Sequence, residues 1–189
     1  MNKKNVSMRP GLAMILFATL VSTIAFAQEK PAEESAGARA PRPRIDAASS
    51  LSLEEARIII EAAVARVRAD KAHAALAVVD DNGNLVSMDR IDGTSSFFAR
   101  FAVGKAVGAV ALQQTTAESS DQYKTNPQRF LSALSMLQGE VLLIRGGFPL
   151  VVNGRIVGGI GSAGHGGDGD VEAAKAGIAA WEKFRQSRK

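Results

Sequence analysis

The sequence contains no cysteine and is poor in histidine, tryptophan and tyrosine, with two, one and one residues respectively. The lack of cysteine excludes disulfide bonds, thiolate metal sites, iron–sulfur clusters and covalently attached c-type haem. Neither histidine has a second histidine at the spacing of a metal-binding pair, so we expect no structural zinc site. A P-loop and a nucleophile elbow are also missing, and no catalytic constellation is evident.

The net charge of +4 and the sequence pI near 9.6 overstate how basic the protein is. Three of the basic side chains, Lys3, Lys4 and Arg9, lie at the start of the chain. Without them, 20 of the 23 basic side chains remain against 19 acidic ones, a net charge of +1. We therefore predict no nucleic-acid partner.

The first residues have the order of regions that is typical of a secretory signal. The basic start is followed by the apolar run Leu12–Ala25 and by Ala25-Phe26-Ala27, a form that signal peptidase accepts. We predict a signal peptide over residues 1–27, cleavage after Ala27 and a periplasmic or secreted protein with no membrane span after cleavage. An uncleaved anchor is the alternative. Residues 28–50, rich in Pro, Ala, Glu and Arg, are predicted to form a disordered linker before a single domain over residues 51–189.

The remaining sequence predicts helices between two groups of strands. Ser52 and Glu55 fit a capping box, and apolar residues recur at helical spacing to about Ala69. Asn82-Gly83 and Asn153-Gly154 each separate two apolar runs, which predicts two β-hairpins. We expect five strands, at about 74–79, 85–90, 141–144, 148–152 and 155–160. Two further helices are expected at 95–112 and 127–137. A last helix, capped by Asp168 or Asp170, is expected to end at about residue 185. This order favours an α+β fold with mostly antiparallel strand pairs.

A glycine-rich segment, residues 161–167, follows the last expected strand and contains His165. Glycine lets a ligand approach the backbone closely, and an unhindered imidazole there could ligate a metal or haem iron. A solvated loop histidine without a role is the alternative. The segment from Gly159 also spells G-x-G-x-x-G, but the helix begins too late for a dinucleotide site and no further strand follows.

Lys105 is expected at the rim of the apolar stripe of the helix over residues 95–112. It could meet an anionic ligand there, or it could lay its stem on apolar surface with its ammonium in water. Gly104 and Gly108 beside it would allow something to pack closely, and a partner helix is the simpler candidate.

Several short motifs together carry a family resemblance that covers the chain from about Leu51 to Trp181. They are Ala77-Val78-Val79-Asp80-x-x-Gly83-x-Leu85-Val86, Met88-Asp89-Arg90-Ile91-Asp92-Gly93, Lys105-Ala106 and the segment around the second hairpin. In these motifs the sequence resembles the GlcG/HbpS-like haem-binding family, which is similar to the C-terminal domain of PduO-type cobalamin adenosyltransferases.

The resemblance implies a profilin-like domain, in which a five-stranded antiparallel sheet is flanked by helices, and a homo-oligomer, either a dimer or a higher oligomer. Some members of the family bind haem between subunits or respond to haem and iron, and many have no known activity. The positions that match the family are Arg90, Asp92, Lys105, Gly147, Pro149, Gly158, Gly159 and Gly161. The sequence departs from the family over residues 162–167, so the resemblance does not supply His165 as a ligand.

We therefore predict an exported, oligomeric haem-binding (tetrapyrrole-binding) protein that acts in haem binding, sensing or buffering and is not an enzyme. The residues expected to bind the cofactor are His165, as the iron ligand, and Arg90, Lys105, Gly161 and Gly164. One alternative is an enzyme or accessory subunit that acts on a small organic acid or another small molecule. The other is a structural oligomer that only binds a protein partner.

Overall fold

The computed structural model of the protein describes residues 51–188, so the predicted signal peptide and linker lie outside the described residues. This part of the chain forms five helices and four strands. In chain order they are α1 (Leu53–Ala69), β1 (Ala75–Asp80), β2 (Leu85–Arg90), α2 (Ser96–Ala111), α3 (Thr116–Thr125), α4 (Pro127–Met136), β3 (Gly147–Val152), β4 (Arg155–Ala163) and α5 (Gly167–Gln186).

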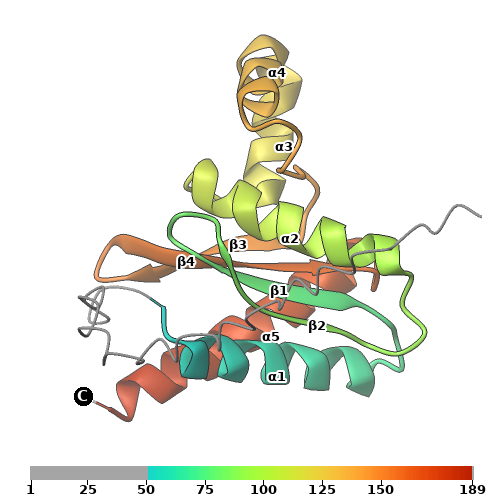
Figure 1. Ribbon diagram of the computed structural model, residues 1–189, viewed down its shortest axis with the longest axis vertical. Helices are drawn as coiled ribbons and strands as arrows, with labels where there is room; N and C mark the ends of the chain where they lie inside the picture. Colours follow the sequence, from blue (N-terminus) through green and yellow to red (C-terminus); the bar gives the residue numbers. More distant parts are fainter. Residues whose placement is uncertain (1–50, 189) are drawn as a thin grey trace, which may run out of the picture. The chain divides into compact units, whose positions relative to one another are not determined.

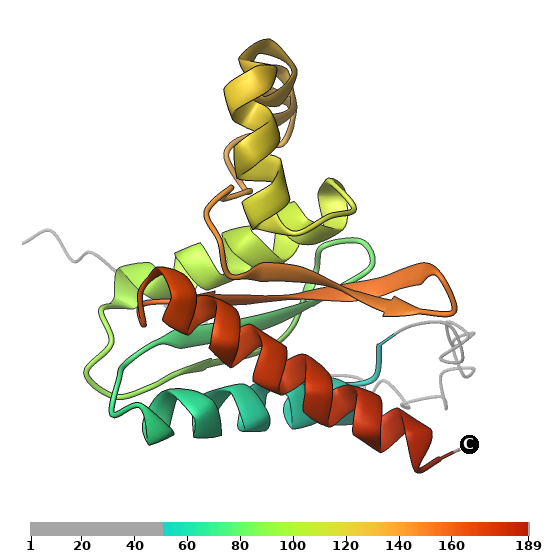
Figure 2. The ribbon, with the colours of Figure 1, turned by 180° about the vertical axis from the view of Figure 1, so that it is seen from behind.

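The strands form one sheet in the order β2-β1-β4-β3, and each neighbouring pair is antiparallel. Helices α1 and α5 cover one face of the sheet, and α2 crosses the other face (Figures 1 and 2). Helices α3 and α4 continue beyond α2, on the side away from the sheet. The α+β class predicted from the sequence is confirmed, but the sheet has four strands among the described residues and not five.

The expected strand at residues 141–144 is wrong. This short apolar segment packs on α2 instead, where the Leu142 amide donates a hydrogen bond to the Gly104 carbonyl at 2.9 Å. A short apolar run indicates burial, and burial against a helix satisfies the same pattern as burial in a sheet. The sequence analysis also missed α3, which begins with a capping box formed by Thr115 and Glu118.

Local signals fixed several boundaries correctly. The capping box at Ser52 is present, with the Glu55 amide donating to the Ser52 hydroxyl at 3.1 Å. Asn153 and Gly154 have φ angles of +51° and +75°, as a tight hairpin turn between β3 and β4 requires. The cap predicted for the last helix is wrong, because Gly166 occupies that position and no side chain caps α5.

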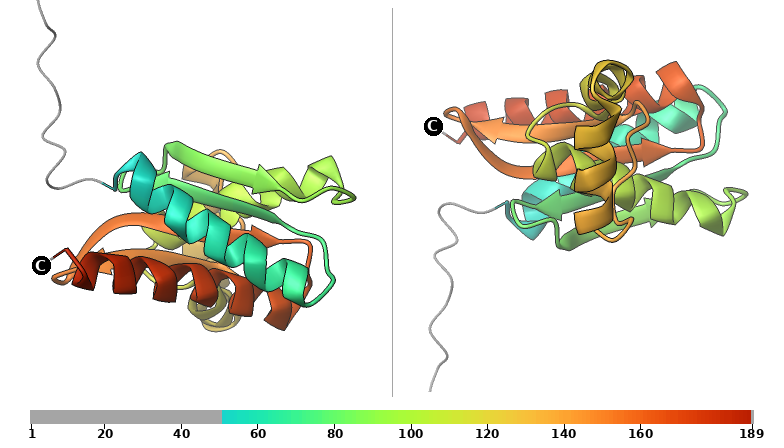
Figure 3. Two further views of the ribbon diagram at one scale, coloured as in Figure 1. Left: turned by 90° about the horizontal axis from the view of Figure 1, so that it is seen from below. Right: turned by 90° about the horizontal axis from the view of Figure 1, so that it is seen from above.

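Large apolar side chains fill the space between the sheet and the pair α1 and α5. Helices α1 and α5 lie side by side over this face (Figure 3, left). The fully buried side chains there include Ile59, Ile60, Leu76, Val78, Ile160 and Trp181. This layer is the main hydrophobic core of the described residues.

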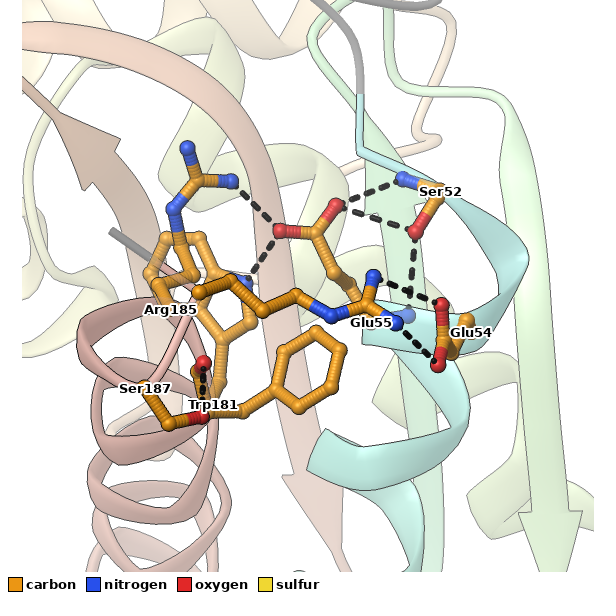
Figure 4. Close-up of polar contacts among 8 residues, drawn as sticks. Ser52, Glu54, Glu55, Trp181, Arg185 and Ser187 are labelled. Carbon is orange, nitrogen blue, oxygen red and sulfur yellow. Dashed lines mark hydrogen bonds and ion pairs between the residues drawn. The ribbon is translucent and has the colours of Figure 1, made fainter.

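A carboxylate at the start of α1 connects the two helices of this face. Glu55 Oε2 accepts from the Ser52 amide at 2.9 Å, and its Oε1 accepts from the Trp181 indole at 3.1 Å and from the Arg185 guanidinium (Figure 4). Burial raises the pKa of Glu55, but the hydrogen bonds from Ser52, Trp181 and Arg185 outweigh it and leave the pKa below its usual value. The ionised carboxylate therefore joins α1 to the last turns of α5.

Candidate functional site

A buried ion pair joins α2 to the first turn of α5. Lys105 Nζ lies 3.0 Å from Asp170 Oδ2, and the two side chains are only 3% and 5% exposed. Lys105 Nζ also donates to the Ser162 carbonyl at 2.7 Å, while Asp170 Oδ1 accepts from the Ser162 hydroxyl at 3.2 Å and from the His165 amide at 3.1 Å. The end of β4, the glycine-rich loop and two helices thus meet at one pair of opposite charges.

Burial lowers the pKa of Lys105, and the charge and hydrogen bond of Asp170 only partly oppose this effect. An ammonium loses favourable hydration when it is buried, so the neutral amine becomes easier to reach. The sequence analysis placed Lys105 at the rim of a helix with its head in water or near an anion. The structure instead buries the whole side chain and supplies the anion from Asp170.

A small hollow opens beside this pair. It has a volume of about 220 Å³, and its lining includes Phe98, Phe101, Lys105, Ile144, Gly164 and Asp170. We call it the Lys105 hollow. Ligand pockets usually measure about 300–1,000 Å³, so this hollow is too small to enclose a porphyrin.

His165 is not the unhindered loop residue that the sequence suggested. Its side chain is 13% exposed, and its Nε2 atom lies 3.4 Å from Asp70 Oδ2 at the end of α1. The ring also packs on the first turn of α5, where a Cβ at Gly169 would lie 2.5 Å from the ring. The structure therefore gives His165 a packing role between α1 and α5, and its role as an iron ligand stays a prediction.

The other predicted site residues are not gathered around one ligand. Gly161 packs on α2, where a Cβ would lie 2.0 Å from the Ala102 carbonyl oxygen. Gly164 has a φ of +117° and lines the Lys105 hollow. Arg90 donates to the Thr94 carbonyl and lines a different depression, so it is not among the residues around Lys105. Of the five predicted residues, only Lys105 and Gly164 line the same hollow.

A larger groove, missed in the sequence analysis, lies over the outer side of α2. It has a volume of about 730 Å³, within the usual range of ligand sites, and its lining includes Leu85, Met88, Phe97, Arg100, Phe101 and Leu142. We call it the α2 groove. Leu85 and Phe97 are more than half exposed, at 52% and 58%, so apolar surface is open to a ligand.

The sequence did carry a signal for this groove. Helix α2 contains three of the eight phenylalanines and is apolar on more than one side. A helix that is apolar all round is normally buried on all sides. The inner side of α2 meets the sheet, whereas the segment 141–144 covers only part of the outer side.

The protein thus combines an α+β domain with the α2 groove and the Lys105 hollow, which both lie beside the apolar helix α2. The family described as "Haem degrading protein HbpS-like" matches residues 51–179. Since this match covers most of the chain, the protein belongs to the HbpS-like family, and the resemblance predicted from the motifs is confirmed.

Solved structures agree with this assignment. The HbpS chain in its crystal structure is 33% identical in sequence to this chain. The match covers 74% of this chain and 96% of HbpS, and the two structures superpose with a TM-score of 0.63. The crystal structure of a PduOC:heme complex is 29% identical, covers 69% of this chain and 94% of its own, and superposes with a TM-score of 0.62.

The corrinoid adenosyltransferase PduO of Citrobacter freundii is 31% identical over 134 residues, which is 70% of this chain. The match spans only 39% of PduO, so it covers a part of that protein and not the whole adenosyltransferase.

Proposed function

We propose that this protein binds haem in the α2 groove. The observation that carries the proposal is the groove itself, which combines exposed apolar surface with a thioether and a guanidinium. Met88 is 36% exposed there, and Arg100 has no carboxylate within ion-pair distance among residues 51–188. A porphyrin needs an apolar wall for its ring, a cation for a propionate and a donor for the iron, and these three residue types supply them.

The relatives support the same ligand. The structure of PduOC is a complex with haem. The description of the family reads "Haem degrading protein HbpS-like". When bound, haem supplies iron redox and ligand-binding chemistry. This chain's own residues contribute the apolar wall of Phe97 and Phe101, the charge of Arg100 and the exclusion of water from one face of the ring. The proposed role is haem binding, with sensing or buffering as its outcome.

A titration with haemin tests the site. We expect the purified protein to develop a Soret band, Arg100→Gln to weaken haemin binding about tenfold, equivalent to about 1.4 kcal/mol, and Met88→Leu to shift the Soret maximum. Arg129→Gln is the matched control, because this exposed arginine lies on α4 and not in the α2 groove. Equal affinities of the two arginine variants, with an unshifted spectrum for Met88→Leu, would place haem elsewhere.

His165→Ala tests the ligand predicted from the sequence in the same titration. If the α2 groove holds haem, this variant should keep the Soret maximum and affinity of the wild type. If the spectrum shifts and affinity falls in His165→Ala but not in the α2 groove variants, the iron is bound at the loop before α5.

We also propose that the protein self-associates. Helix α4 exposes Leu131 and Met136 at 55% and 84%, and Ile144 is 50% exposed. Apolar surface of this kind is commonly buried by a symmetric partner. Light scattering at micromolar concentration should give at least a dimer, and a monomer at high concentration would contradict the proposal.

The signal-like start of the sequence supports export, with cleavage after Ala27. The described residues include no helix that is both long and apolar enough to cross a membrane. The intact mass of protein from the periplasm should correspond to a chain that begins at Gln28. A mass that retains Met1 would contradict the proposed cleavage.

A further inference from the structure

The Lys105 hollow shares only Phe101 with the α2 groove, and it holds the most deeply buried lysine ion pair of the described residues. Phe98 and Phe101 form apolar walls around Lys105. Ile144 and Gly166 are exposed and mark the open side of the hollow. A small molecule can therefore enter beside a charged pair that most of the protein shields from water.

The surroundings of Lys105 Nζ leave room for a reaction. An ammonium has three N–H donors, and two acceptors, the Ser162 carbonyl and Asp170, lie within hydrogen-bond distance of Nζ among residues 51–188. Gly146 lies next to the amine, where a Cβ would be 3.1 Å from Nζ. A Cβ there would also lie 2.9 Å from Asp170 Cβ and from the Ser162 carbonyl oxygen, so glycine at this position lets the chain pack closely on the ion pair.

We propose that Lys105 captures small aliphatic aldehydes as a Schiff base in this hollow. The proposal does not depend on haem binding, because Lys105 and Asp170 do not line the α2 groove and only Phe101 borders both. A lysine amine that is desolvated in an apolar pocket is the usual nucleophile for carbonyl compounds. Asp170, 3.0 Å from Nζ, is placed to accept and return the proton that the reaction moves.

The reaction balances within this pair of residues. Asp170 accepts one proton from the Lys105 ammonium, and the neutral amine attacks the aldehyde carbon, forming the C–N bond. The carbonyl oxygen becomes a hydroxyl after a proton passes to it from the nitrogen. Asp170 then returns its proton to this hydroxyl, which leaves as water, and the C=N bond of a protonated imine forms. The imine is cationic, so it preserves the ion pair with Asp170 and no unpaired charge is left buried.

The walls of the hollow select the class of carbonyl compound. Phe98, Phe101 and Ile144 favour an alkyl chain over a polar one. The volume of about 220 Å³ restricts the chain to a short one. The Asp170 carboxylate repels a second negative charge, which disfavours oxo acids. A short, uncharged aldehyde is the compound that meets these conditions.

Reductive trapping measures the reaction at each lysine. The full-length protein is incubated with butanal and sodium cyanoborohydride at neutral pH without haem, and alkylated lysines are quantified by peptide mass spectrometry. Lys175 is the internal reference, because its side chain is 57% exposed and it lies on α5. We expect Lys105 to be alkylated faster than Lys175, since burial lowers the pKa of Lys105 and Asp170 is placed to take its proton. Burial alone would make Lys105 the slower residue, so alkylation of Lys105 no faster than that of Lys175 overturns the proposal.

Two variants test the assigned roles. Lys105→Arg keeps the positive charge but cannot form the imine, so the fast alkylation should disappear, while Lys175→Arg should retain it. Asp170→Asn removes the acid that protonates the departing hydroxyl, so it should slow alkylation of Lys105 about tenfold at neutral pH, and the deficit should shrink as the pH falls and solvent supplies that proton. An unchanged rate and pH profile in Asp170→Asn would overturn the role of Asp170. The rates in the unmodified protein decide the main proposal even if a variant does not fold. Alkylation without a haemin Soret band, or the reverse, separates this proposal from the proposed function.

Discussion

The two faces of the sheet are packed differently, one through large side chains and the other through close contact with a helix backbone. Toward α1 and α5, the strands present large side chains such as Leu76, Val78 and Ile160, which fill a thick apolar layer. Toward α2, the same strands present Ala75, Ala77 and three glycines of β3 and β4, and the helix backbone takes the place of side chains. At Gly147, Gly159 and Gly161, a Cβ would lie 2.0–2.7 Å from a carbonyl oxygen of α2.

This difference determines where the protein can bind ligands. Helix α2 meets the sheet through small residues such as Ala102, and Phe98 and Phe101 pack against this contact while staying only partly buried. The phenylalanines of α2 line the α2 groove and the Lys105 hollow: Phe97, Phe98 and Phe101. The large residues of the other face are instead buried in the core. Close packing on one side of α2 thus leaves apolar side chains available on the other.

The largest loss of stability should come from truncating a large side chain in the apolar layer between the sheet and the helices α1 and α5. Ile160 is fully buried, so Ile160→Ala leaves a cavity and should cost about 4 kcal/mol of unfolding free energy, measured by urea denaturation. Val151→Ala is the control, because Val151 on β3 is 48% exposed and its truncation should change stability by less than about 0.5 kcal/mol. Similar losses in both variants would mean that this layer is not the main core.

Adding one methyl group at the contact between the sheet and α2 should lower the unfolding free energy by nearly as much. Gly161→Ala would place a Cβ 2.0 Å from the Ala102 carbonyl oxygen, and moving the helix backbone should cost about 3 kcal/mol in the same assay. Gly108→Ala is the matched control on α2, because the nearest atom to its new Cβ would be 3.5 Å away. Alanine has the better helix propensity, so this control should be neutral or stabilising by up to about 1 kcal/mol. A Gly161→Ala variant as stable as the wild type would remove the distinction between the faces.

A smaller, pH-dependent effect should come from the carboxylate that joins α1 to α5. Glu55→Gln weakens the hydrogen bonds to Trp181 and Arg185 and should cost about 1.5 kcal/mol at neutral pH. Because the pKa of Glu55 is lower in the folded protein than in the unfolded chain, its contribution is full above the ordinary value of about 4.5. The contribution is lost as the pH falls through the folded pKa.

Urea denaturation between neutral pH and pH 3 measures this dependence. The wild type should lose more stability on acidification than Glu55→Gln does, and the curves should converge at low pH. Glu172→Gln is the control, because that carboxylate is 51% exposed in its pair with Lys175. Parallel pH curves for the wild type and Glu55→Gln would contradict the assignment.

The smallest effect on folding should come from the outer side of α2. Phe97 is 58% exposed, so Phe97→Ser should change the unfolding free energy by less than about 0.5 kcal/mol. The same variant should weaken haemin binding, because it removes apolar surface from the α2 groove. Unchanged haemin affinity in Phe97→Ser would show that this surface does not bind haem.

The sequence alone determined much of the local structure, and it determined the family. Caps such as Ser52 and turns such as Asn153-Gly154 act within a few residues, so their signals can be read without the rest of the chain. The motifs around Asp80, Arg90 and Lys105 likewise identified the family. Helical and strand periodicity placed the elements that carry those motifs within a few residues of their observed ends.

Only the tertiary structure decided which residues meet. The apolar run at 141–144 packs on α2 and not in the sheet, because hydrophobicity rewards burial without specifying the partner. Lys105 and Asp170 are 65 residues apart, and no local pattern shows that they form one buried pair. The glycines of β4 looked like room for a ligand, yet at Gly161 that room is taken by the backbone of α2. Contacts between distant residues depend on how the layers stack, which the sequence pattern of a single element does not contain.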